Sequence, residues 1–302
     1  VPWIANDGWL YYSRTEEGKS YDIICRKLGT DGEEQIILDI NAEAEGLEFY
    51  DVTNWETSPD GTRLAWLADS TGYEENDLII KDLATGEILD RSVTKADPFS
   101  LGWANDNETI FYARHDEAKR PDRIFRHRVG TDPNEDVMVY HDPDGRFYVS
   151  AGRSRSGESL FIQSGSQLTS EWHEIDTSNP ERPPRVIAPR RQGIEYEVER
   201  HGDRYFILTN EDATNFRLMT AQVADPSPEN WTEFKAHDED VYLTGVDAFK
   251  DHLVLSQRRN GYSTLEIVSL DDEGGSHLLE VPEEVSTVGV GTNERFDTSM
   301  LR

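Results

Sequence analysis

The sequence predicts an all-β fold, a seven-bladed β-propeller whose last blade is incomplete in this chain. A short unit recurs seven times at intervals of 43 to 53 residues. Each complete interval contains about four short runs that are rich in Tyr, Phe, Val and Ile and bounded by Gly, Pro, Asn or Asp. A period in the forties with four strands per unit is typical of a propeller. Only residues 41–47 show, weakly, the apolar period of a helix.

The recurring unit is a turn residue, usually followed by a polar residue, and then a short apolar and aromatic run. Its seven copies begin at Gly8, Gly61, Asn107, Gly157, Gly202, Lys250 and Asn293. The seventh copy has barely begun a strand when the sequence stops at Arg302, and the first residue is Val1 rather than Met. We therefore expect the chain to be a piece of a longer protein.

Strands are predicted in chain order from these runs. No Pro-rich or Ser-rich linker separates the units, which predicts one propeller domain over residues 1–302. The turn Ser58-Pro-Asp-Gly61 supplies the residues that a tight reversal requires. The predicted strands of the second, third and fourth units are residues 51–55, 63–68, 77–83 and 87–89; 99–103, 109–114, 123–128 and 136–140; and 147–151, 159–163, 171–175 and 185–187.

The charge of the chain excludes some partners. Asp and Glu number 60 against 30 Lys and Arg, so the formal net charge is −30. Nucleic acid and anionic membrane surfaces both require clustered cations, so we expect neither as a partner. A basic ligand would be attracted to this chain. The alternative is that surface carboxylates only keep the protein soluble.

The single cysteine, Cys25, excludes an internal disulfide and suits a reducing compartment. We expect a cytoplasmic location, with the periplasm left open. Because Cys25 lies in a predicted strand with no histidine nearby in the sequence, it reads as a packed residue rather than a nucleophile.

Catalytic and metal-binding motifs are missing from the sequence. Gly152-Arg-Ser-Arg-Ser156 lacks the second glycine of a nucleophile elbow and lies between two predicted strands. The sequence has no phosphate-binding glycine loop and no His-Glu-x-x-His. Asp132 opens a calcium-like loop, but Val137 stands where that loop requires glycine. We expect no catalytic residue, no cofactor and no metal within this chain.

One stretch, from Arg114 to Arg128, is basic in an otherwise acidic chain. Its cations are Arg114, Lys119, Arg120, Arg123, Arg126 and Arg128, mixed with Tyr112, His115, Phe125 and His127. They either form ion pairs with neighbouring blades or make a loop that contacts a docking partner or a substrate.

Several segments together resemble oligopeptidase B (protease II) of the prolyl oligopeptidase family, and the likeness runs through the whole chain. The segment 11–27 (YYSRTEEGKSYDIICRK) and the segment 81–87 (KDLATGE) are the more specific ones. Asp22 departs from the proline that relatives often carry. The other matching segments are 58–61, 103–106, Tyr112, 126–132, 135–136, 169–171 and 215–218.

The resemblance implies a seven-bladed propeller that covers a separate α/β-hydrolase domain carrying a Ser-Asp-His triad, in an enzyme that cleaves short peptides after Lys or Arg. That domain is absent here, so the resemblance assigns gating and size selection to this chain, and the chain alone should be inactive. Residues 111–126 resemble the part of the related propeller that approaches the substrate pocket. They nominate Tyr112, Arg114, Arg120 and Arg123 for contact with the substrate pocket or with the hydrolase domain. A stand-alone propeller that binds or scaffolds other molecules is the alternative.

Overall fold

The computed structural model describes residues 2–271, 274–281 and 287–302. Two compact units divide the chain, and the prediction of one domain over residues 1–302 stays a prediction. The first unit is Val1–Arg153, Leu160–Ser164 and Ile175–Pro184, and the second is Ser154–Ser159, Gly165–Glu174 and Arg185–Arg302.

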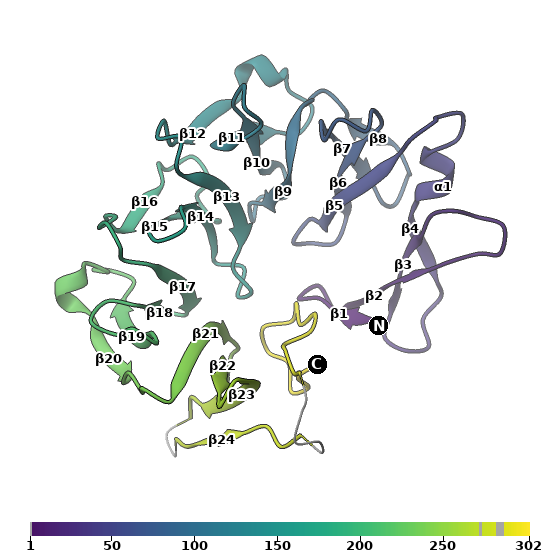
Figure 1. Ribbon diagram of the computed structural model, residues 1–302. Coiled ribbons are helices and arrows are strands. Elements are labelled where there is room, and N and C mark those ends of the chain that lie inside the picture. Colours follow the sequence, from purple (N-terminus) through teal and green to yellow (C-terminus); the bar gives the residue numbers. More distant parts are fainter. Residues whose placement is uncertain (1, 272–273, 282–286) are drawn as a thin grey trace. The chain divides into compact units, whose positions relative to one another are not determined.

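The described residues form six antiparallel sheets of four strands each, which confirms the all-β prediction. Three sheets lie wholly in the first unit and follow one another along the chain (Figure 1). Their strands are β1 (Trp3–Ile4), β2 (Trp9–Arg14), β3 (Ile23–Leu28) and β4 (Gln35–Asp39); β5 (Asp51–Thr57), β6 (Arg63–Asp69), β7 (Asp77–Asp82) and β8 (Ile88–Asp90); and β9 (Ala96–Trp103), β10 (Thr109–His115), β11 (Pro121–Arg128) and β12 (Val137–His141).

The fourth sheet has residues in both units, and the last two sheets belong to the second unit. In every sheet, strands that are consecutive in the sequence are hydrogen-bonded neighbours. These strands are β13 (Tyr148–Arg153), β14 (Ser159–Gly165), β15 (Ser170–Asp176) and β16 (Arg185–Ala188); β17 (Tyr196–His201), β18 (Arg204–Thr209), β19 (Arg217–Gln222) and β20 (Thr232–Lys235); and β21 (Val241–Ala248), β22 (His252–Arg259), β23 (Tyr262–Ser269) and β24 (Ser276–Leu278).

Six of the seven copies of the recurring unit lead into the second strand of a sheet: β2, β6, β10, β14, β18 and β22. Five of the six turn residues, Gly8, Gly61, Asn107, Gly157 and Gly202, have a positive φ. In the turn before β6, the Gly61 amide donates to the carbonyl oxygen of Ser58 at 2.8 Å, and Gly61 has a φ of +68°. A residue with a Cβ is strained in that conformation, which explains the glycine at this point of the unit.

Strand β6 reads as a continuous apolar run because both of its faces are covered. In β6, Leu64 and Trp66 pack with Tyr11 of the first sheet. The alternate residues Ala65 and Leu67 pack in the cluster that contains Trp103 of the third sheet. All four of these β6 residues are fully buried. A strand buried on both faces loses the polar alternation of a half-exposed strand, and this makes it easy to recognise in a sequence.

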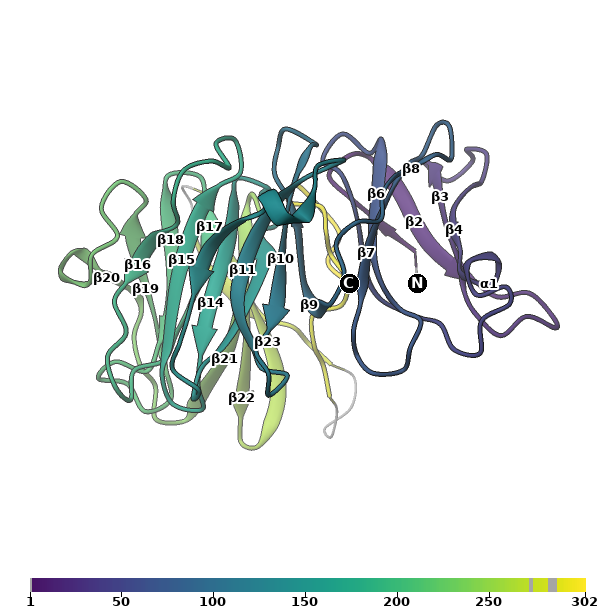
Figure 2. The same ribbon diagram turned by 90° about the horizontal axis from the view of Figure 1, so that it is seen from above.

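Strand β9 begins at Ala96, three residues before its predicted start at Phe99. Pro98 obscures the start because proline cannot donate to a sheet ladder. The structure accommodates it because β9 lies at the edge of its sheet, beside β10 (Figure 2). The register between β9 and β10 also shifts between Tyr112 and Arg114.

Helices are few in the described residues. The weak helical period at 41–47 corresponds to a single turn, α1 (Ile40–Glu43), whose Asp39 side chain accepts from the Asn41 amide. Two 3₁₀ turns are Pro133–Glu135 and Pro228–Asn230. None of the described helices is long and apolar enough to cross a bilayer.

Residues 287–302, which include the seventh copy of the recurring unit, contain no strand. They nevertheless pack on the last sheet, since Val288, Val290 and Leu301 contact a core of Phe249 and Val254. Six sheets are therefore described, and the count of seven blades stays a prediction.

Candidate functional site: a charged pocket at Arg114

The hairpin of β10 and β11 carries the four residues nominated from the sequence. Tyr112 is fully buried, its ring stacks on Phe125 with 5.8 Å between centroids, and its hydroxyl donates to Asp136 Oδ2 at 2.7 Å. Burial, reinforced by the hydrogen bond to Asp136, raises the pKa of Tyr112 far above its ordinary value. Tyr112 is thus part of the core beneath the site.

Arg120 anchors a loop from within the protein. Its Nη1 donates to the carbonyl oxygens of Asp142 at 3.3 Å, Asp144 at 2.8 Å and Phe147 at 2.5 Å. Its Nε donates to Asp116 Oδ2 at 3.0 Å. A guanidinium has five N–H donors, so these contacts occupy most of them. In the described residues Arg120 therefore positions the segment 142–147.

Arg123 is held beside the pocket without lining it. Its Nε donates to Asp122 Oδ1 at 2.7 Å, and its Nη2 donates to the carbonyl oxygen of His115 at 3.3 Å. A third of its side chain is exposed. Arg123 thereby supports the residues that follow β10.

Arg114 differs from the other nominated arginines. Its guanidinium carbon lies 5.3 Å from the centroid of the Tyr112 ring and 5.0 Å from that of Phe125, so the cation rests on two aromatic faces. Its Nε is buried and has no hydrogen-bond partner in the described part of the chain. Among the three nominated arginines, Arg114 alone is not engaged with a carboxylate in the described residues.

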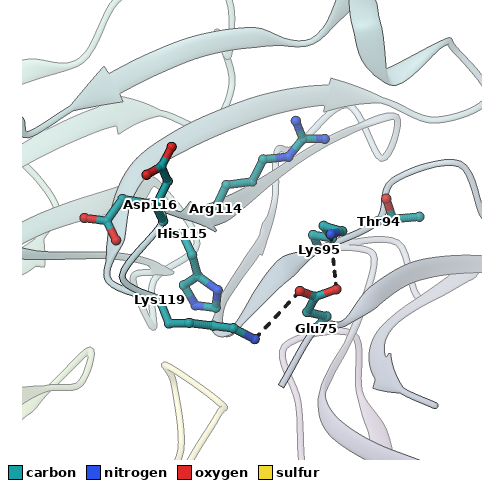
Figure 3. A pocket seen from close by; sticks show the side chains of 8 residues that line it. Glu75, Thr94, Lys95, Arg114, His115, Asp116 and Lys119 are labelled. Atoms are coloured by element: carbon teal, nitrogen blue, oxygen red, sulfur yellow. Dashed lines mark ion pairs between the residues drawn. The ribbon is translucent and has the colours of Figure 1, made fainter. Parts of the chain in front are cut away.

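Arg114 lines a cavity of about 390 Å³ in the first unit. The lining comes from three connections: the loop between β6 and β7, the segment between β8 and β9, and the end of β10 with the loop that follows it (Figure 3). The lining residues are Glu75, Thr94, Lys95, Arg114, His115, Asp116, Glu117 and Lys119.

Three cations (Lys95, Arg114, Lys119) and three carboxylates (Glu75, Asp116, Glu117) line this pocket. Glu75 lies between two lysines, with its carboxylate oxygens 3.3 Å from Lys95 Nζ and 3.7 Å from Lys119 Nζ (Figure 3). Asp116 is engaged by Arg120, which is not among the lining residues. Glu117 is exposed. One paired carboxylate thus serves two lysines, while Arg114 adds a further positive charge.

His115 lines the same wall, and its imidazole is paired with a carboxylate. Its Nε2 lies 2.7 Å from Asp97 Oδ2, and the Asp97 side chain is almost fully buried. The pair fixes the imidazole ring against β9. Arg114, Lys95 and Lys119 remain as the cations of the pocket.

Backbone strain gathers around this cavity. Among the described residues, seven non-glycine residues have a positive φ. Two of them line the pocket, Lys95 at 58° and Lys119 at 63°, and Glu74 at 59° immediately precedes the lining residue Glu75. Each such residue costs on the order of 1 to 2 kcal/mol, so the surrounding contacts must hold it in place. Strain of this kind concentrates at binding sites.

His127, elsewhere in the basic stretch, has a structural role. It is fully buried, with Nδ1 2.7 Å from Asp136 Oδ1 and Nε2 2.9 Å from Asp90 Oδ2. Burial alone would lower the pKa of His127, but the hydrogen bonds to both carboxylates outweigh it and raise the pKa. Asp90 belongs to β8 and His127 to β11, so this ion pair joins two neighbouring sheets.

No group of three or more His, Cys, Asp or Glu side chains suited to a metal ion occurs within the described residues. Cys25 is fully buried in β3, as expected of a packed residue.

The family model for the prolyl oligopeptidase N-terminal β-propeller domain matches residues 1–302. The chain belongs to this family. Its similarity to curated relatives covers nearly its whole length: it is 33% identical to dipeptidyl aminopeptidase BI of Pseudoxanthomonas mexicana and 35% identical to protease 2 of Moraxella lacunata, over 98% of the chain in both cases. The propeller domain spans only 43% of either relative.

Solved structures of the family agree with the fold of this propeller domain. Oligopeptidase B from Leishmania major superimposes with a TM-score of 0.93 at 27% identity, over all of this chain and 44% of that one. Oligopeptidase B from Trypanosoma brucei, with covalently bound antipain, gives a TM-score of 0.90 at 32% identity over the same shares. The predicted propeller class and the family resemblance are confirmed.

Three of the eight lining residues, Glu75, Thr94 and Lys95, lie outside the basic stretch that the sequence singled out. Sequence reasoning nominated Arg114 and noted Lys119 and His115, because all three lie in that stretch. Lys95 and Glu75 stand 19 and 39 residues before Arg114, in loops of other strands. Their only local signal is that each flanks a predicted strand.

Proposed function

We propose that this propeller domain is the gating and size-selecting part of a serine oligopeptidase that cleaves short peptides after Lys or Arg. The observation that supports it is the match of the entire chain to the propeller of this peptidase family, with less than half of each relative covered. In such a protein the Ser-Asp-His triad lies in an α/β-hydrolase domain outside this chain. That domain is the first proposed partner of the propeller, and short basic peptides are the second.

The charge of the propeller favours basic substrates. A net charge of −30 raises the local concentration of cationic peptides around the protein. In the second unit, Glu197 and Glu199 on β17 share their surroundings with Asp247 on β21. Burial, together with the nearby Asp247 carboxylate, raises the pKa of Glu197 to about 7 and that of Glu199 to about 8. A peptide cation near them would favour their ionised forms.

We further propose a cytoplasmic location, in keeping with a single buried cysteine and the absence of any possible internal disulfide. Nucleic acid and anionic membrane surfaces are excluded as partners in this proposal, because the net charge of −30 repels both.

The proposal is tested by comparing the full-length protein with the 302-residue chain on a peptide that contains one internal arginine. The full-length protein should cleave after the arginine, and mass spectrometry of the products identifies the bond. Successive release of dipeptides from the N-terminus, irrespective of arginine, would contradict the specificity. The isolated chain should show no hydrolysis, because it offers no nucleophile, base and oxyanion hole together. Turnover by the isolated chain that a serine-directed reagent blocks would contradict that expectation.

Salt should slow the full-length enzyme selectively on dibasic peptides. Exposed charges are screened over about 8 Å at physiological ionic strength and over about 3 Å at 1 M, so electrostatic steering fades as salt rises. We expect kcat/KM for a dibasic peptide to fall by about tenfold between low and high salt. The control is a substrate with the same cleaved residue and neutral flanks. An equal decline for both substrates, or no decline, would mean that the acidic surface serves solubility alone.

A further inference from the structure

We propose that the pocket lined by Arg114, Lys95 and Lys119 binds the C-terminal carboxylate of a short peptide. This inference rests on the proposed function for the class of ligand, since a peptidase propeller meets short peptides with free ends. It assigns to the propeller a contact with the far end of the substrate rather than with the residue at the cleaved bond.

The chemistry of the pocket suits one carboxylate. Arg114 presents a planar guanidinium, which binds a carboxylate through two parallel N–H donors. Its position over Tyr112 and Phe125 fixes the plane of that fork. The buried Nε without a partner in the described residues shows that the internal contacts of the propeller leave donor capacity unused. Because this Nε is itself buried, a ligand carboxylate would meet the terminal Nη donors of the same guanidinium.

Lys95 and Lys119 can bind a ligand carboxylate with little loss of stability. Their side chains are 70% and 48% exposed for Lys95 and Lys119, and both share the carboxylate of Glu75. Exposed ion pairs contribute only about 0 to 1 kcal/mol, so a ligand carboxylate can compete for these ammonium groups. The Thr94 hydroxyl adds a neutral donor to the same wall.

The size of the pocket fits a chain end. A cavity of about 390 Å³ holds a terminal residue and its carboxylate, at the lower end of the range for small-ligand sites. Lys95 and Lys119 have positive φ values, so the surrounding contacts must hold their backbones in place around the cavity. Lys119 Nζ also donates to the carbonyl oxygen of Tyr73, which ties the loop after β10 to the loop after β6. The wall is therefore built before any ligand arrives.

The test compares binding of three peptides to the 302-residue chain by calorimetry. They are N-acetylated Ala-Arg-Ala-Ala with a free C-terminus, the same peptide as its C-terminal amide, and N-acetylated Ala-Arg-Ala-Asp as its C-terminal amide. The overall charge of −30 favours the first amide, which carries one more net positive charge than the free acid. The pocket predicts the opposite order, with the free acid bound about tenfold tighter. Long-range electrostatics cannot produce this order.

The third peptide separates a terminal carboxylate from any carboxylate. It has the same net charge as the free acid, and the proposal expects it to bind as weakly as the first amide. Binding as tight as the free acid would overturn the assignment to the chain end. Equal affinity of the first two peptides, a preference for the amide, or no binding of any peptide at millimolar concentration would overturn the pocket assignment as a whole.

Variants test whether the preference for the free acid arises at this pocket. Arg114→Gln should abolish the preference for the free acid, and Arg114→Lys should retain part of it. Arg128→Gln is the matched control, because Arg128 loses the same charge from the same stretch while its side chain is 68% exposed and pairs with Glu108 away from this pocket. If Arg114→Gln fails to fold by circular dichroism, Lys119→Gln should still reduce the preference several-fold. Retention of the full preference in the folded variants would overturn the proposal.

The test of the pocket can fail or succeed independently of the test of the proposed function. A matched pair without arginine, N-acetylated tetra-alanine as acid and amide, reports on the pocket alone. If the full-length enzyme does not cleave after Lys or Arg while the acid still binds tighter, only the proposed function falls. If cleavage occurs and the acid shows no preference, only the pocket assignment falls.

Discussion

Glu174→Ala should lower the free energy of unfolding by about 3 to 5 kcal/mol, because it leaves buried donors without their acceptor. Glu174 on β15 is 6% exposed. Its Oε1 accepts from Ser159 Oγ at 2.5 Å and Arg200 Nη1 at 2.8 Å. Its Oε2 accepts from Arg185 Nη2 at 2.9 Å and from the Tyr205 hydroxyl. Burial alone would raise the pKa of Glu174, but these donors outweigh it and lower the pKa.

The measurement is urea unfolding of the wild-type chain and of the variant, followed by circular dichroism. Glu158→Ala is the control, because Glu158 approaches the same Arg200 at 3.7 Å but has a side chain that is 46% exposed. Its removal should change the free energy of unfolding by less than about 1 kcal/mol. A loss below about 1 kcal/mol for Glu174→Ala, or equal losses for both variants, would show that the buried carboxylate does not stabilise the second unit.

The strands could be predicted from the sequence where packing imposes a local pattern. Strand β6 is covered on both faces, so its residues form a continuous apolar run behind a turn of proline and glycine. Buried runs behind turns also begin β10, β14, β18 and β22, whereas β2 is only partly buried. Together these strands produce the repeat that predicted the fold. Where the pattern is interrupted, as by Pro98 in β9, the predicted boundary was wrong by three residues.

The roles of the site residues depend on contacts that the local sequence does not contain. Arg114 and Arg120 are both cations of one basic stretch, and nothing near them in the sequence distinguishes them. The carbonyl oxygens that bind Arg120 belong to residues 22 to 27 positions further along the chain. In the described part of the chain, Arg114 Nε has no acceptor, and the guanidinium rests on Tyr112 and Phe125. Burial thus separates a structural arginine from one with donor capacity left for a ligand.

The pocket itself arises from the meeting of loops that belong to two sheets. Glu75 follows β6, Lys95 precedes β9, and Lys119 follows β10. Each residue alone is an ordinary charged residue in a loop, since exposed charges are common everywhere in this chain. Only the pairing of the strands brings Glu75 between the two lysines. A single sequence carries no signal for that distance.

His127→Gln should destabilise the first unit by about 3 to 5 kcal/mol near pH 6, and the loss should shrink as the pH rises. Both ring nitrogens of His127 face carboxylates, Asp136 at 2.7 Å and Asp90 at 2.9 Å, so both must donate and the imidazole is a cation. Its pKa is raised in the folded state. A raised folded pKa gives stability that is fully present below the unfolded value of about 6.5 and is lost as the pH passes through the folded pKa.

Protonation of Asp90 should remove the stabilisation by the His127–Asp90 pair at low pH. Burial alone would raise the pKa of Asp90, but hydrogen bonds from Ser92, His127 and the Gly130 amide outweigh it and lower the pKa. Its contribution is therefore present above the unfolded value of about 4 and is lost as the pH falls through the folded pKa. Urea unfolding of wild type and His127→Gln at intervals from pH 5 to pH 9 measures the difference, with the exposed His277→Gln as the control. A difference that stays constant, or grows with pH, would mean that His127 is neutral in the folded protein and joins the two sheets by packing alone.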